Sequence, residues 1–139
     1  MASHYTPRDA NSNSVESRGT YGERQLARMF HRYHIRYFFE HPLAVIDREK
    51  VRVYYPDFWL PDFAVAVEYV GGIGLDGYEQ CLAHKKAVYN ENGVRCIYVS
   101  PDDMKRYWPR RILRELRAVT ERRLERIASV EQHLYYNRK

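Results

Sequence analysis

Two carboxylates, Asp57 and Glu68, stand at the ends of neighbouring apolar segments. Asp57 follows a proline, which interrupts regular strand pairing, and Glu68 ends the apolar run Phe63 to Val67. If the two segments pair as antiparallel strands about the turn at Leu60-Pro61-Asp62, the two acids come close together. Like charges at that distance repel each other, and a metal ion relieves the repulsion. The pattern therefore favours a shared cation over two separate solubilising edge charges.

Two further charged residues are predicted to lie on helices near this pair. Glu23 closes a capping box that opens at Thr20, and it is either only the box residue or also a third acid directed towards the sheet. Lys85 falls on the apolar face of a helix predicted over residues 78–90. An unpaired buried ammonium is costly, so pairing with the strand-end acids is favoured over a lysine that snorkels to solvent. Lys86 points away from that face.

Strands and helices are predicted to alternate along the chain, which indicates an α/β (α+β) protein. The half-buried strand over residues 51–55 is predicted from the alternation of Val51, Val53 and Tyr55 with Arg52 and Tyr54. The predicted order is a helix from Thr20-Tyr21, a strand over 35–39, an apolar segment over 43–46, a polar turn over 47–50, the strand over 51–55, the two strands around Leu60-Pro61-Asp62, a glycine-rich loop over 71–77, the helix over 78–90, a strand over 94–99 and a long helix from about 109 to 134.

The composition places limits on the class of protein. With 139 residues the chain suits one domain over 20–139, preceded by a flexible polar leader over 1–19. Its 23 Lys+Arg against 18 Asp+Glu give a net charge of +5, a mildly basic balance that suits nucleic acid. Cys81 and Cys96 form neither a metal box nor a disulfide framework and are expected to be buried thiols. The absence of an 18-residue apolar run and of a signal peptide predicts no membrane partner and a cytoplasmic protein.

The long helix predicted at the C-terminus, over about 109–134, is amphipathic. Its heptad seam contains Thr120 and Arg123, which argues against a sustained coiled coil. The opposite side carries Arg110, Arg114, Arg117 and Arg122. These arginines are either a solvated face balanced by nearby glutamates or a face that follows phosphates, and the sequence leaves both interpretations open.

The order of these elements and charges resembles the PD-(D/E)xK nuclease superfamily, the restriction-endonuclease-like fold. Pro56-Asp57 matches the second motif of the superfamily, Glu68 the acid of the third motif, and Glu23 the glutamate that many members carry on the first helix. Val70 stands where the third motif has its lysine. One branch of the superfamily carries the lysine on the following helix, where Lys85 matches it. The resemblance covers roughly residues 22–103.

The resemblance implies a central mixed β-sheet flanked by helices and a Mg²⁺- or Mn²⁺-dependent deoxyribonuclease that acts as a homodimer. Asp57 and Glu68 would bind the metal with the backbone carbonyl of Tyr69, and Glu23 would bind it directly or through water. Lys85 would orient the attacking water or stabilise the charge that develops on the phosphate. Basic residues would hold the DNA backbone, namely Lys86, Lys105, Arg106 and Arg110.

Two alternatives from other classes remain. One is a catalytically inactive DNA-binding or assembly module of the same fold, which gains support if Lys85 points away from the acids. The other is a small α/β scaffold that binds a protein partner through the C-terminal helix, and it leaves the three acids unexplained.

Overall fold

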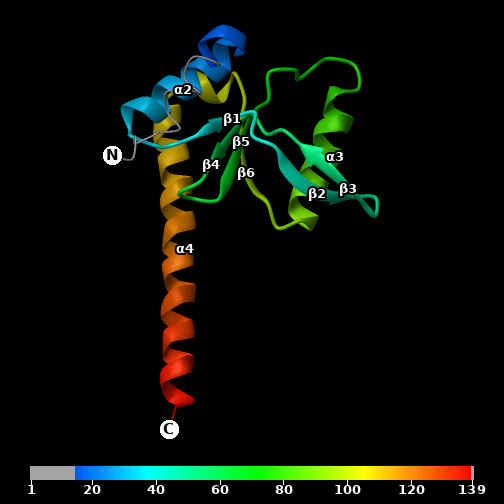
Figure 1. Ribbon diagram of the computed structural model, residues 1–139. Helices are drawn as coiled ribbons and strands as arrows, with labels where there is room; N and C mark the ends of the chain where they lie inside the picture. Colours follow the sequence, from blue (N-terminus) through cyan, green and yellow to red (C-terminus); the bar gives the residue numbers. More distant parts are fainter. Residues whose placement is uncertain (1–14, 139) are drawn as a thin grey trace, which may run out of the picture. The chain divides into compact units, whose positions relative to one another are not determined.

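The computed structural model describes residues 15–138, which form two compact units, the first extending to Arg106 and the second beginning at Tyr107 (Figure 1). The second unit is a single helix, α4 (Trp108–Tyr136). The first unit contains, in order, α2 (Tyr21–Arg32), β1 (Phe38–Phe39), β2 (Leu43–Asp47), β3 (Lys50–Tyr54), β4 (Phe58–Leu60), β5 (Val65–Tyr69), α3 (Tyr78–Glu91), β6 (Arg95–Val99) and the 3₁₀ helix η1 (Asp103–Lys105). None of the helices in residues 15–138 has both the length and the apolar character to cross a membrane.

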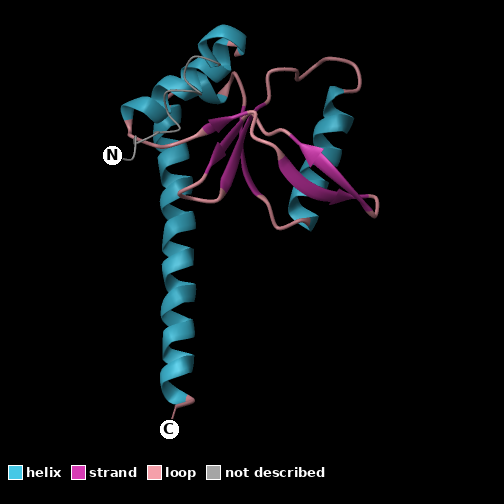
Figure 2. Ribbon diagram, viewed as in Figure 1, coloured by secondary structure: helices cyan, strands magenta, loops and turns pink. Residues whose placement is uncertain are grey.

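Four strands form a mixed sheet in the order β1-β4-β5-β6 (Figure 2). β4 pairs antiparallel with both β1 and β5, whereas β6 pairs parallel to β5. A parallel pair needs a long crossover, and α3 provides it between β5 and β6. The expected mixed sheet with flanking helices and a long C-terminal helix is therefore present.

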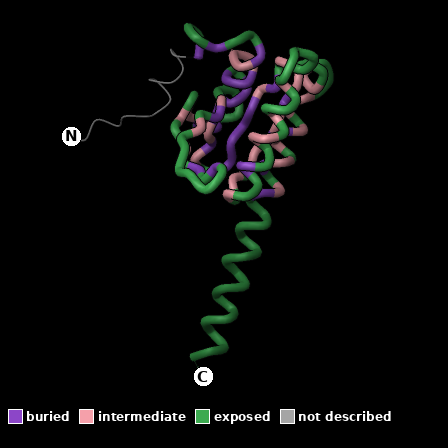
Figure 3. The backbone as a smooth tube through the Cα atoms, turned by 90° about the vertical axis from the view of Figure 1, so that its right-hand side faces the viewer, coloured by how far each residue is buried: buried purple, intermediate pink, exposed green. Residues whose placement is uncertain are grey.

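The core of the first unit lies along the central strands, which are buried in Figure 3. Phe30 of α2 packs edge-on against Phe58 of β4, with the ring centroids 5.2 Å apart. Phe58 is opposite Val67 in the register, so both side chains face α2. The neighbouring Glu68 must point to the other face, and there it meets α3. Successive side chains of β5 therefore point alternately to an apolar face, which packs against α2, and to a face with charged groups, which meets α3.

The hairpin of β2 and β3 forms a separate two-stranded ribbon. Its turn residues, Arg48 and Glu49, both have left-handed backbone conformations, as two-residue hairpin turns require. The expectation that Val51, Val53 and Tyr55 form the apolar side of a half-buried strand is wrong, because all three are exposed. The buried side of the ribbon is its other face, which α3 covers.

Three further expectations need correction. The strand predicted over 35–39 contains only Phe38–Phe39, since Ile35 N–H donates to the Phe30 carbonyl in the turn that follows α2. Residues 15–18 of the predicted leader are helical, while residues 1–14 lie outside the described part of the chain. Neither cysteine is fully buried. Cys81 is exposed, because the fully buried positions of α3 come only later in the helix, at Val88 and Tyr89, and Cys96 of β6 is half-buried.

Candidate active site

Asp57 and Glu68 face each other across the β4–β5 pair. Phe58 is paired with Val67, so the next position outwards places Asp57 opposite Glu68. Opposite residues of an antiparallel pair have Cβ atoms about 5 Å apart on the same side of the sheet. Glu68 is only 4% exposed. The structure therefore brings together the two acids that the sequence predicted to meet.

Glu68 receives two donors from the same helical stripe of α3. Lys85 Nζ lies 3.2 Å from Glu68 Oε1, and the Tyr89 hydroxyl donates to the same oxygen at 2.9 Å. Residues four apart on a helix project from one side, which explains how both reach one carboxylate. Within residues 15–138, no group donates to Glu68 Oε2. Lys85 thus points towards the acids, and Glu68 keeps one oxygen available.

Asp57 is held by the backbone of the opposite strand. Its Oδ2 accepts a hydrogen bond of 2.7 Å from the Tyr69 N–H. Burial, followed by the nearby charge of Glu68, raises the pKa of Asp57 to about 7. The Tyr69 N–H and Lys85 oppose this shift but do not cancel it. The pair of acids therefore carries more negative charge than its immediate surroundings compensate near neutral pH.

Glu23 is both a capping residue and a contributor to the charge at this site. Its Oε2 accepts from Thr20 N–H at 2.7 Å, and Thr20 Oγ1 accepts from Glu23 N–H, so the predicted capping box is present. Its charge also raises the pKa of Asp57. The position of α2 is fixed by Gly22, where an added Cβ would lie 2.1 Å from the ring of Tyr69. Only glycine allows this approach, which keeps Glu23 near the acid pair.

The donor set suits a hard divalent cation. Among the described residues no three His, Cys, Asp or Glu side chains form a metal-binding group, and the facing acids at the site are the pair Asp57 and Glu68. Each carboxylate has an oxygen to which no described residue donates. Mg²⁺ is usually bound by one or two carboxylates and keeps several waters, and this pair fits that requirement. Lys85 lies beside the pair and contributes a positive charge to the site.

Two of the four predicted DNA-contacting residues, Lys86 and Lys105, have contacts with residues other than Asp57 and Glu68. Lys86 is placed over the ring of Tyr98, with its Nζ 4.7 Å from the centroid, and lines a groove of about 470 Å³. Lys105 forms an ion pair with Asp102 at 2.6 Å. Arg106 is exposed at the end of the first unit, and Arg110 belongs to α4 in the second. The structure brings neither Lys86 nor Lys105 into contact with the acids.

The polar role of Tyr89 is not among the expectations drawn from the sequence. Tyr89 follows Lys85 by four residues on α3, and its hydroxyl contacts Glu68. The four-residue spacing from Lys85 was the signal that both side chains could reach the same acid. Burial and the neighbouring Glu68 raise the pKa of the Tyr89 hydroxyl, so it remains a hydrogen-bond donor.

Comparisons with known proteins do not assign the chain to a family: no protein-family model, no curated protein and no solved structure matches it. Arguments about function therefore depend on the site itself.

Proposed function

We propose that the protein is a Mg²⁺- or Mn²⁺-dependent DNA endonuclease. The observation that carries the proposal is the facing pair Asp57 and Glu68, with Lys85 Nζ in contact with Glu68 Oε1. A buried acid and a half-buried acid opposite each other are unfavourable unless a cation joins them. The resemblance to the PD-(D/E)xK superfamily supplies the reaction class, and the net charge of +5 suits a polyanionic substrate.

In this proposal each residue has one task. Asp57 and Glu68 would hold the metal ion with the Tyr69 carbonyl, and Glu23 would support the site directly or through water. When bound, the metal would supply an acidified water and neutralise charge on the phosphate. Lys85 stabilises the negative charge that develops on the scissile phosphate. Tyr89 orients Glu68 through the hydrogen bond from its hydroxyl to Glu68 Oε1.

The direct test is cleavage of plasmid DNA by wild type, Asp57→Ala and Glu68→Ala with Mg²⁺, with Mn²⁺ and with EDTA. Wild type should cut only with metal, and both variants should be inactive. Without metal, Asp57→Ala should melt at the wild-type temperature or above it, because the substitution removes a repulsive charge. Near-normal cleavage by either variant would refute the site assignment.

Affinity for DNA should depend steeply on salt, because basic side chains bind phosphates by releasing counterions. Fluorescence anisotropy with a labelled duplex should show a loss of at least ~10²-fold between roughly 50 and 200 mM salt. Glu68→Ala is a suitable protein for this measurement because it should bind without cutting. An affinity that stays constant over this range would argue against nucleic acid as the substrate. A protein that binds DNA in this way but never cuts it would be the inactive module instead.

A further inference from the structure

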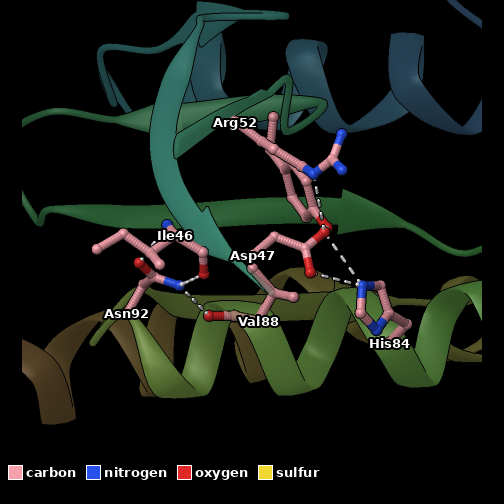
Figure 4. Close-up of polar contacts among 7 residues, drawn as sticks. Ile46, Asp47, Arg52, His84, Val88 and Asn92 are labelled. Carbon is pink, nitrogen blue, oxygen red and sulfur yellow. Dashed lines mark hydrogen bonds and ion pairs between the residues drawn. The ribbon is translucent and has the colours of Figure 1, made fainter. Parts of the chain in front are cut away.

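The β2–β3 ribbon is attached to α3 by polar contacts around the buried acid Asp47 (Figure 4). Asp47 Oδ1 lies 3.0 Å from His84 Nε2, and Asp47 Oδ2 accepts from the Tyr54 hydroxyl at 2.8 Å. At the C-terminal end of the helix, the Asn92 side chain accepts from the Ile46 N–H at 2.8 Å and donates to the Ile46 carbonyl at 2.9 Å. The ribbon is therefore held on the helix at two points.

The side chain of Tyr54 also connects this attachment to the candidate active site. Its ring meets the ring of Tyr89 at an angle of 63°, with the centroids 5.9 Å apart. Aromatic pairs favour such a tilted contact over a parallel face-to-face stack. The Tyr89 hydroxyl donates to Glu68 Oε1 at 2.9 Å. An unbroken series of contacts therefore runs from Asp47 through Tyr54 and Tyr89 to Glu68.

The two tyrosine rings have little freedom to turn. Tyr89 is 1% exposed, and Tyr54 is half-buried. The hydrogen bond from the Tyr54 hydroxyl to Asp47 has a preferred direction, which an apolar contact lacks. Asp47 is itself held by His84 of α3, the helix that carries Tyr89. The ring of Tyr54 is thus fixed at its hydroxyl end and lies against the ring of Tyr89.

Glu68 needs this support because a metal site requires well-placed ligands. Mg²⁺ demands near-ideal octahedral geometry, so a carboxylate that turns away binds it more weakly. The facing Asp57 also repels Glu68 when no cation lies between them. The side chain of Lys85 is flexible and 37% exposed, whereas Tyr89 is enclosed. Of the two donors to Glu68 Oε1, Tyr89 is therefore the one that fixes the orientation of the carboxylate.

We propose that Tyr54 is a positioning residue of the candidate metal site. Asp47 holds Tyr54, the ring of Tyr54 keeps Tyr89 in place, and the Tyr89 hydroxyl keeps Glu68 in the orientation that binds the cation. This inference rests on the proposed function, because it concerns the metal site of that proposal. Replacing a group that orients a metal ligand typically weakens metal binding by about 10- to 100-fold.

The test is a double-mutant cycle on the affinity for Mn²⁺, measured by electron paramagnetic resonance of the free ion with the full chain and without DNA. The four proteins are wild type, Tyr54→Leu, Tyr89→Phe and the double variant. Each single substitution should weaken Mn²⁺ binding by about 10-fold. Because Tyr54 acts through the hydroxyl of Tyr89, the double variant should bind no more weakly than Tyr89→Phe.

Two further variants separate positioning from a general effect on the fold. Tyr55→Leu is the matched control, because Tyr55 is the next residue and is 60% exposed, and it should bind Mn²⁺ like wild type. Tyr54→Phe keeps the ring and loses the hydrogen bond to Asp47. It should recover most of the affinity lost in Tyr54→Leu and still bind more weakly than wild type. If Tyr54→Leu does not fold, the cycle is made with Tyr54→Phe, and again no further loss is expected beside Tyr89→Phe.

The proposal is overturned if the Tyr54 variant that folds binds Mn²⁺ like wild type, or if the two losses multiply in the double variant. An equal loss in Tyr55→Leu also overturns it, because the effect then belongs to the strand and not to the ring. Wild type that binds Mn²⁺ no better than Glu68→Ala would refute the metal site, and with it both the proposed function and this inference. The expected cycle without any cleavage of DNA supports the positioning role and refutes the nuclease alone.

Discussion

Asp47 and Glu68 are the two buried acids among the described residues, and α3 contacts both. Asp47 is surrounded by donors: the Tyr54 hydroxyl, His84 and, at 3.8 Å, Arg52. The hydrogen bonds from Tyr54 and His84 hold the pKa of Asp47 below its usual value. Its charge is satisfied locally, and its evident task is to attach the ribbon to the helix.

Glu68 is in the opposite situation. Its two donors, Lys85 and Tyr89, share one oxygen, and the acid opposite it, Asp57, has a raised pKa. The structural acid Asp47 has several donors around one carboxylate. The pair of Asp57 and Glu68 instead has more negative charge than the neighbouring donors compensate. Asp47 and Glu68 are similarly buried, so burial does not distinguish a candidate metal site from a buried ion pair. The balance between negative charge and donors does.

The largest effect should come from substituting the lysine beside Glu68. Lys85→Ala should lower the cleavage rate by at least ~10²-fold, typical of losing one group that stabilises transition-state charge. Lys86→Ala is the matched control, because Lys86 is turned about 100° away on the helix and contacts the ring of Tyr98. It should weaken DNA binding modestly and leave the rate unchanged. Single-turnover kinetics at saturating enzyme separate the two effects.

The opposite result, in which Lys86→Ala abolishes cleavage and Lys85→Ala does not, would show that the contact with Glu68 has no catalytic role. If neither substitution changes the rate, another group performs the task of the lysine.

The acid pair could be predicted from the sequence because its cause is local. The turn between Leu60 and Val65 sets the register that places Asp57 opposite Glu68, and the helical period sets the direction of Lys85. The partners of Asp47 could not be found in this way. Asp47 was assigned to a polar turn, but it is buried by His84, which lies 37 residues further along the chain. Alternation shows that a strand has two faces, but only the packing of α3 decides which face is covered.

The next effect concerns stability as a function of pH in the absence of metal. The pKa of Asp57 is raised from 3.8 to about 7 in the folded protein, so between these values the folded state binds a proton that the unfolded state has lost. Stability from this group therefore falls as pH rises through that window. Asp57→Asn removes the titration and should melt several degrees above wild type at pH 8, since about 1 kcal/mol corresponds to roughly 4 °C for a domain of this size.

The measurement is the difference in Tm between wild type and Asp57→Asn from pH 4 to pH 8 in EDTA, because the difference cancels the other titrating groups. Added Mg²⁺ should raise the Tm of wild type at pH 8 and have little effect on the variant. A difference that does not change with pH would show that the two acids do not repel each other in the folded protein.

The smallest and most selective change should come from Asp47→Asn, and its sign is reversed. Because the folded pKa of Asp47 lies below 3.8, its charge contributes stability above that value, and the contribution is lost as pH falls through the folded pKa. Asp47→Asn should therefore melt below wild type near neutral pH, and the gap should close in acid, below about pH 4. Thermal melts of both proteins from pH 2 to pH 7 would show this. A gap that widens in acid would mean that Asp47 is as poorly compensated as the pair at Asp57 and Glu68, and the contrast between the two buried acids would fail.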